Sequence, residues 1–239
     1  MKSLFLLLLS WLKLGKLATT AGTMLLSLAA YAGIWGWRYA AGFIGLLFLH
    51  EMGHYIAARQ RGLCVGAPTF IPFVGAWINL ESQLLDAETE AYVGMGGPFL
   101  GSVGALCAYL WARHVDSQLL LAISYAGFFL NLFNLLPLSP LDGGRITAVL
   151  SPRVWLIGAP IMLALTFYQP SPLLILVALL ALPQVAKAWR YDANAPENIV
   201  YYGVPMSVKL EYGVGYLGLC GLLAVMTFEV HDMLSAVRM

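Results

Sequence analysis

The chain has little charge. Only 10% of its 239 residues are Asp, Glu, Lys or Arg, whereas about a quarter are charged in an ordinary soluble domain. The formal net charge is +1 and no basic cluster is present, so the sequence predicts no nucleic-acid or other polyanionic partner. Cysteine is scarce too. Cys64, Cys107 and Cys220 are odd in number and widely separated, which favours buried free thiols over a disulfide framework or a thiolate metal site.

Apolar residues, by contrast, are abundant. They account for 60% of the chain, and the mean hydropathy is +0.79. We therefore predict an all-α polytopic membrane protein of about six to seven transmembrane helices. The apolar runs lie at about 18–36, 40–58, 91–112, 118–136, 154–168, 171–188 and 209–229. Gly96-Gly97-Pro98 interrupts the third run, and Pro170 and Pro172 join the fifth and sixth as an antiparallel hairpin.

The distribution of Lys and Arg predicts the orientation. Lys13 and Lys16 interrupt the first apolar residues, which disfavours a cleaved signal and favours an interfacial helix leading into the first span. Of the 13 Lys and Arg residues, a cytoplasmic N-terminus leaves only Arg38, Arg113 and Arg238 outside. The second span then runs from the outer side to the cytoplasm, and it carries the most informative motif of the chain.

That motif is His50-Glu51-Met52-Gly53-His54. Two His residues four apart on a helix share one face and can bind one Zn²⁺, and the Glu beside the first is the usual general base of a zinc peptidase. Ionisable side chains at membrane depth are costly, so three together indicate a functional site. The alternative is buried polar residues that neighbouring helices satisfy.

A second polar stretch ends the fourth apolar run. It reads Asn134-Leu-Leu-Pro137-Leu-Ser-Pro140-Leu-Asp142-Gly143-Gly144-Arg145. The prolines end the helix and the glycines allow a turn, so Asp142 can point back into the bundle as a third zinc ligand. Two other roles stay open at this point. Asp142 can belong to an ordinary Asp-Gly turn or cap a helix starting near Gly144, and Asn134 can bridge two helices.

The stretch from Pro68 to Leu80 does not follow a helical pattern. Its β-branched and aromatic residues, with Pro72 and Gly75, predict a short strand or hairpin near the active site. Such a strand could bind an extended peptide by strand addition, with Phe70, Pro72 and Gly75 as candidate substrate-binding residues. A short interfacial loop is the equal alternative.

Together these motifs resemble those of the site-2 protease family of intramembrane zinc metalloproteases. The matching residues are His50 to His54, Ala58 to Gly62, Phe70 to Pro72, Gly96 to Pro98, and the set Asn134, Pro137, Asp142 and Gly143. The match covers about residues 40–150, the expected catalytic core of a single domain over 1–239, with C-terminal helices at about 151–239. No polar stretch suggests a PDZ or CBS domain, so the chain resembles a compact member.

The resemblance implies a multi-pass cell-membrane enzyme with one Zn²⁺ per chain, held by His50, His54 and Asp142. Its substrate would be a membrane-anchored regulatory protein, cut within or beside its transmembrane segment near the cytoplasmic side. Zinc-bound water would be the nucleophile, Glu51 the general base, and Asn134 would help to position the substrate backbone.

Three alternatives stay open. A metal transporter would also place His and Asp at mid-depth, but its path must open on both sides, and the outer half lacks further His or acidic residues. A catalytically inactive relative that binds membrane helices would not need Glu51. A prenyl-protein type zinc protease would take its third ligand from a later Glu, yet Glu211 and Glu229 lack a nearby His.

Overall fold

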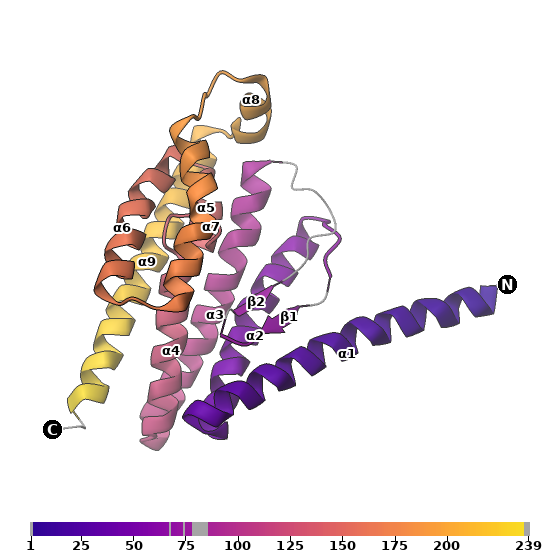
Figure 1. The fold of residues 1–239 in the computed structure, drawn as a ribbon, viewed down its shortest axis with the longest axis vertical. Coiled ribbons are helices and arrows are strands. Elements are labelled where there is room, and N and C mark those ends of the chain that lie inside the picture. The colour runs from indigo at the N-terminus through magenta and orange to yellow at the C-terminus, as the bar shows by residue number, and fades with distance from the viewer. Residues whose placement is uncertain (1, 67, 74, 78–85, 237–239) are drawn as a thin grey trace.

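A computed structural model describes residues 2–66, 68–73, 75–77 and 86–236. It is a bundle of long helices with one short antiparallel hairpin beside it (Figure 1). In chain order the elements are α1 (Lys2–Trp35), α2 (Trp37–Gln60), β1 (Thr69–Ile71), β2 (Gly75–Trp77), α3 (Ala87–Val115), α4 (Gln118–Asn134), α5 (Asp142–Ala148), η1 (Pro152–Val154), α6 (Trp155–Tyr168), α7 (Pro172–Trp189), α8 (Pro196–Tyr202) and α9 (Met206–Ala236).

Three of the described helices are long and apolar enough to cross a membrane, namely α3, α7 and α9. The helix α4 and the stretch Pro152–Tyr168 are apolar but shorter. Many large apolar side chains on these helices are exposed, including those of Trp111, Phe167 and Phe228. By length and composition these are the helices of a membrane protein, because such surfaces match hydrocarbon and not water.

The centre of the bundle is the row α2, α3, α4, α9, in which each helix packs against the next. Glycines permit the closest of these approaches. Where α2 crosses α3, a Cβ atom on Gly53 would overlap the carbonyl oxygen of Gly96. Small residues at helix crossings are typical of membrane bundles, where close packing replaces the hydrophobic effect.

The helices α6 and α7 form the predicted antiparallel hairpin and pack against each other. The turn lies at the predicted prolines, since α6 ends at Tyr168 and α7 begins at Pro172. The side chain of Ser171 caps α7 by accepting a hydrogen bond from the backbone N–H of Leu174. Trp155, Met162 and Val177 are buried in the core cluster that this pair shares with α5 and α8.

Two helices are more continuous than the apolar runs of the sequence. The helix α1 is unbroken from Lys2 to Trp35, so the predicted interfacial helix and the first span lie in one helix. The helix α3 also continues through Gly96-Gly97-Pro98. A proline removes only one backbone donor, and membrane helices tolerate this loss when their neighbours pack closely. The glycines here permit contact with α2 and do not end the helix.

The hairpin occupies part of the stretch predicted to be extended; residues 74 and 78–80 of that stretch lie outside the described residues. Its register pairs Thr69 with Trp77, Phe70 with Ala76 and Ile71 with Gly75. Phe70 is buried and its ring stacks on Phe48 of α2, with the ring centroids 6.4 Å apart. Phe48 lies two residues before His50, so the hairpin packs on the helix that carries the His pair.

Candidate metal centre

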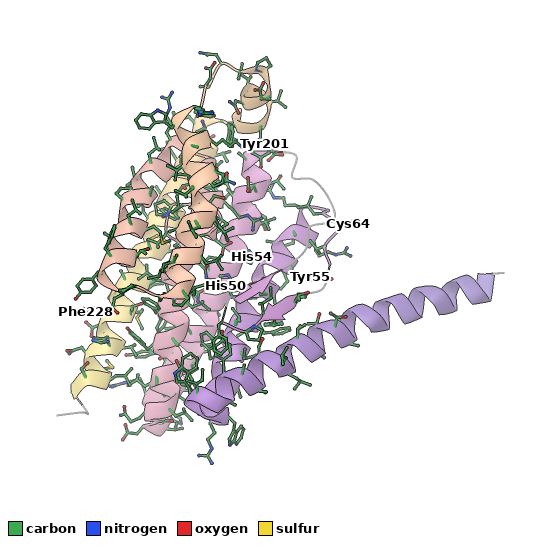
Figure 2. The ribbon with its side chains drawn as sticks, viewed as in Figure 1. His50, His54, Tyr55, Cys64, Tyr201 and Phe228 are labelled. Carbon is green, nitrogen blue, oxygen red and sulfur yellow. The ribbon has the colours of Figure 1, made fainter. Side chains whose placement is uncertain are left out.

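The helix α2 places His50 and His54 on one face, one turn apart. Both are buried, with 3% and 8% of their surface exposed, and both lie about midway along the bundle (Figure 2). The Nε2 atoms of the two rings are 3.2 Å apart. Two imidazoles that meet at their Nε2 atoms inside an apolar bundle form half of a metal-binding site.

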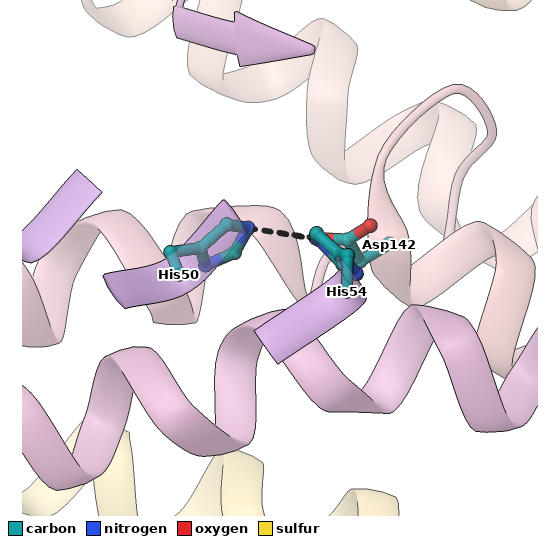
Figure 3. A group of neighbouring side chains, drawn as sticks. All are labelled: His50, His54 and Asp142. Carbon is teal, nitrogen blue, oxygen red and sulfur yellow. Dashed lines mark hydrogen bonds and ion pairs between the residues drawn. The ribbon is translucent and has the colours of Figure 1, made fainter. Parts of the chain in front are cut away.

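Asp142 completes the group. It is the first residue of the short helix α5, and its side chain makes no capping hydrogen bond within that helix. Instead, its Oδ2 atom lies 3.2 Å from Nε2 of His50 and 3.2 Å from Nε2 of His54 (Figure 3). The structure therefore brings together the three residues that the sequence predicted as metal ligands, across 88 positions from His54 to Asp142 (142 minus 54).

The turn that carries Asp142 is held on several sides. Its backbone is packed so closely that a Cβ atom on Gly143 would overlap the carbonyl group of Leu135. The indole Nε1–H of Trp155 donates to the carbonyl oxygen of Gly144 at 2.8 Å. The hydroxyl of Tyr216, in α9, donates to the carbonyl oxygen of Leu135 at 2.5 Å. These contacts fix the position of α5, and with it that of the Asp142 carboxylate.

The spacing of the three ligand atoms fits zinc. A zinc–nitrogen bond of about 2.0–2.1 Å in a tetrahedral site places neighbouring ligand atoms roughly 3.3 Å apart, close to the three separations of 3.2 Å. The donor set of two imidazoles and one carboxylate is one that catalytic zinc sites use, and it leaves a fourth position open. In the described part of the chain, these residues form the one such group of His, Cys, Asp and Glu.

The other nitrogen of each ring has a protein partner. Nδ1 of His54 lies 2.8 Å from the carbonyl oxygen of Val93, and Nδ1 of His50 lies 2.8 Å from Oδ1 of Asn131. Asn131 was not predicted from the sequence. Its one signal there is that it is a polar residue in the middle of the apolar run of α4. Asn134, three residues further on, is the residue that matches the family motif.

Two glycines of α3 make room for these side chains. A Cβ atom on Gly97 would overlap the imidazole of His54, and one on Gly101 would overlap the amide of Asn131. The residues are four apart, so they lie on the same face of α3. The helix α3 therefore has no side chain at the two positions where the ring of His54 and the amide of Asn131 pack against it.

Glu51 lies beside the ligands. It is buried, with 6% of its surface exposed, and its carboxylate interacts electrostatically with His50, His54 and Asp142. A buried carboxylate next to a metal-binding group is placed to accept and return a proton. The role of Glu51 as the general base stays a prediction.

The second carboxylate oxygen of Asp142, Oδ1, has a cationic neighbour. The Nη1 atom of Arg145 lies 3.8 Å from this oxygen, and the Nε atom of Arg145 lies 3.7 Å from Oε1 of Glu90. Glu90 also accepts a hydrogen bond of 2.5 Å from the hydroxyl of Tyr201 in α8. Glu90 is in the first turn of α3, and it also links that helix to α5 and α8.

Four further residues were predicted to bind substrate. Asn134 donates to the carbonyl oxygen of Leu130, within its own helix, at 3.1 Å. Phe70 is in β1, Pro72 follows that strand directly, and Gly75 begins β2. A role in binding substrate stays a prediction for all four.

No protein-family model matches this chain. It is 27% identical to the probable chloroplastic zinc metalloprotease EGY1 of Arabidopsis thaliana, over 44% of this chain and 28% of that protein. It is 29% identical to the zinc metalloprotease MJ0392 of Methanocaldococcus jannaschii, over 44% of this chain and 32% of that protein. The chain thus spans about a third of the length of these curated relatives.

Among solved structures, the chain is similar to the site-2 protease from Methanocaldococcus jannaschii, with a TM-score of 0.46 and 20% identity over 70% of this chain and 85% of that one. The relatives found by sequence are zinc metalloproteases. They agree with the resemblance that the motifs predicted as far as the reaction class: this chain is similar in sequence to zinc metalloproteases.

Proposed function

We propose that the chain is an intramembrane zinc metalloprotease that hydrolyses a peptide bond within or beside the transmembrane segment of a membrane-anchored regulatory protein. The observation that carries this proposal is the meeting of three buried ligand atoms, 3.2 Å apart, next to the carboxylate of Glu51. The names of the sequence relatives support the same reaction.

In this proposal His50, His54 and Asp142 hold one Zn²⁺. When bound, zinc polarises the scissile carbonyl group and acidifies a water molecule. Glu51 accepts the proton of the attacking water and returns it to the leaving amine. The hydrophobic surroundings strengthen the electrostatic interactions among these groups, because little water is present to screen them.

The same bundle supports a proposal on topology. We infer six to seven membrane crossings, a cytoplasmic N-terminus and a site that opens toward the cytoplasm. The first turn of α3, a helix that contacts α8, holds the ion pair between Arg61 and Glu88, at 3.0 Å, and the pair between Arg145 and Glu90. Two arginines at this end of α3 agree with a cytoplasmic placement by the positive-inside rule.

We further propose a single domain over residues 1–239. The catalytic core, about 40–150, depends on helices that follow it, because Trp155 of α6 and Tyr216 of α9 donate hydrogen bonds to the backbone around Asp142. This dependence supports one folding unit and argues against a core that stands apart from the C-terminal helices.

The hairpin is a candidate platform for an extended substrate, and the two strands differ as platforms. The outer edge of β1 is already satisfied by α1: Thr23 Oγ1 accepts from the N–H of Phe70 at 3.2 Å, and Thr20 donates to the carbonyl oxygen of Pro68 at 2.6 Å. Pro68 and Pro72 flank Phe70 at the alternate positions and have no N–H to offer. We therefore propose that a substrate strand pairs with β2, at Ala76.

The substitution Glu51→Gln tests the catalytic proposal. It keeps the size of the side chain but removes the proton acceptor, so zinc content is expected to stay near one per chain while cleavage is lost. Zinc is measured by atomic absorption of the purified protein. Cleavage is followed by comparing single-span fragments in membranes of cells that carry the parent or the variant.

Glu88→Gln is the matched control. Glu88 pairs with Arg61 at a partly exposed site, so this variant is expected to cut as the parent does. Cleavage by the Glu51→Gln form would remove Glu51 from its role. Zinc transport into proteoliposomes without cleavage would identify a metal transporter instead, and binding of membrane helices without either would identify an inactive relative.

A further inference from the structure

Asn131 is the most completely buried polar residue next to the metal-binding group. It lies in α4 with 1% of its surface exposed. Its amide makes two contacts: Nδ2 donates to the carbonyl oxygen of Gly127 at 2.7 Å, and Oδ1 lies 2.8 Å from Nδ1 of His50. A buried polar side chain in an apolar bundle is costly unless both ends are satisfied, and here both are.

The Gly127 contact determines which way the amide points. A carbonyl oxygen can only accept a hydrogen bond, so the amide must present its NH₂ group to Gly127. The other end, facing His50, is then an oxygen, which can also only accept. His50 must therefore carry a proton on Nδ1. In the neutral ring, which is the form that binds a metal, its Nε2 atom then has a lone pair, and this atom lies 3.2 Å from Oδ2 of Asp142.

The same logic holds for His54, but with a different partner. Its Nδ1 faces the carbonyl oxygen of Val93, so it too carries a proton on Nδ1 and a lone pair on Nε2. Backbone supplies the partner of His54, whereas a side chain from another helix supplies the partner of His50. A substitution can therefore remove the partner of His50, but not the backbone carbonyl group that is the partner of His54.

We infer that Asn131 is a positioning residue that sets the tautomer and the ring orientation of His50 for metal binding. This inference rests on the proposed zinc site. Outer partners of this kind typically change metal affinity by about 10- to 100-fold when removed. Because Asn131 is in α4 and Asp142 begins α5, the next helix of the chain, the segment from α4 to α5 supplies one ligand and also orients another. The packing of α4 on α2 then decides whether the three ligand atoms meet.

The test is the zinc affinity of the full chain in detergent, measured by competition with a chromogenic chelator. Asn131→Leu keeps the branching of the side chain at Cγ but accepts no hydrogen bond, and it is expected to weaken zinc binding roughly 10- to 100-fold. Asn131→Asp restores an acceptor for Nδ1–H and is expected to bind zinc about tenfold more tightly than the Leu variant. Co²⁺ absorption reports the ligand geometry independently of activity.

Asn134→Leu is the matched control, since Asn134 lies one turn along the same helix and bonds only to the backbone of that helix in the described structure. It should leave zinc affinity unchanged. Gly101→Ala gives a second route if Asn131→Leu does not fold, because a Cβ atom there would displace the Asn131 amide. It should also weaken zinc binding.

Two outcomes would overturn the inference: zinc affinity in Asn131→Leu or Gly101→Ala equal to that of the parent, or equal loss in the Leu and Asp variants, which would leave Asn131 a purely space-filling role. These outcomes differ from failure of the proposed function. If the parent itself binds no zinc, the metal site is wrong. If the parent binds zinc and cleaves while Asn131→Leu matches it, only the role of Asn131 is wrong.

Discussion

Gly53 and Gly96 meet backbone to backbone where α2 crosses α3, so closely that neither position has room for a side chain. A Cβ atom on Gly96 would lie 2.5 Å from the carbonyl oxygen of Gly53. Gly53 lies in the turn of α2 that separates His50 from His54. The helix α2, which carries two of the three proposed metal ligands, is therefore fixed against α3 at the level of those residues.

Gly53→Ala is expected to destabilise the protein by about 1–3 kcal/mol, because the added methyl group meets rigid backbone and the helices must separate. Zinc affinity should fall as well, since His54 is the next residue. Gly45→Ala, on the same helix with nothing within 4 Å of the added Cβ, should be neutral or stabilising. Denaturant unfolding in detergent measures both, and equal stabilities would contradict the close crossing.

Asp142→Ala is expected to abolish stoichiometric zinc binding, because it removes one of three ligands and leaves the two His side chains alone. Asp86→Ala provides the contrast. Asp86 caps α3, and its side chain accepts from the N–H of Thr89 at 2.6 Å. That variant should keep its zinc while losing about 1 kcal/mol of stability. Zinc retained in Asp142→Ala would show that Asp142 is not a ligand.

The sequence was sufficient for features that depend on local pattern. The apolar runs located the long helices, the prolines located the turn between α6 and α7, and the spacing of His50 and His54 placed them on one face. Asp142 needed the family resemblance, because an Asp-Gly turn alone is equally consistent with a simple turn or a cap. Its position near the His pair depends on the packing of α5.

Other features depend on contacts between distant segments, and the sequence could not reveal them. In the sequence, Asn131 is only a polar residue within an apolar helix, because its contact with His50 exists only once α2 packs against α4. Pro98 predicts a break, and only the close contact with α2 explains why α3 continues. The short helix α8 has no apolar periodicity to signal it, and Tyr201 gains a role only through Glu90, which lies 111 residues away.

Thr23→Val tests whether α1 covers the outer edge of β1. The variant keeps the shape of the side chain but removes the acceptor for the N–H of Phe70. Loss of one hydrogen bond of about 0.5–1.5 kcal/mol should speed exchange of that amide roughly 2- to 10-fold. Hydrogen exchange with mass spectrometry of a peptide over 68–73 measures it. Thr166→Val, whose hydroxyl bonds to Met162 within α6, should leave this peptide unchanged.

Tyr201→Phe tests the link between α8 and α3. Burial, together with the negative charge of Glu90, raises the pKa of Tyr201 above its ordinary value of 10.0. A pKa raised on folding contributes stability that is complete below pH 10 and is lost as the pH rises further. The parent should therefore lose stability above pH 10 more steeply than the variant, which should be about 1 kcal/mol less stable at neutral pH.

The measurement is the free energy of unfolding in detergent at neutral pH and above the ordinary tyrosine pKa. Tyr168→Phe is the control, because its side chain is 82% exposed at the end of α6 and should leave the alkaline dependence of the parent intact. A Tyr201→Phe variant with the same alkaline slope as the parent would rule out a stabilising bond to Glu90.

The hydrogen bond from Tyr216 to the carbonyl oxygen of Leu135 has a consequence for biosynthesis. A ribosome translates residue 216 long after His50, His54 and Asp142 have left the exit tunnel. The turn that presents Asp142 therefore gains this support only after α9 has been inserted beside α4. A nascent chain that lacks α9 holds all three proposed ligands but lacks one of the contacts that position the Asp142 carboxylate.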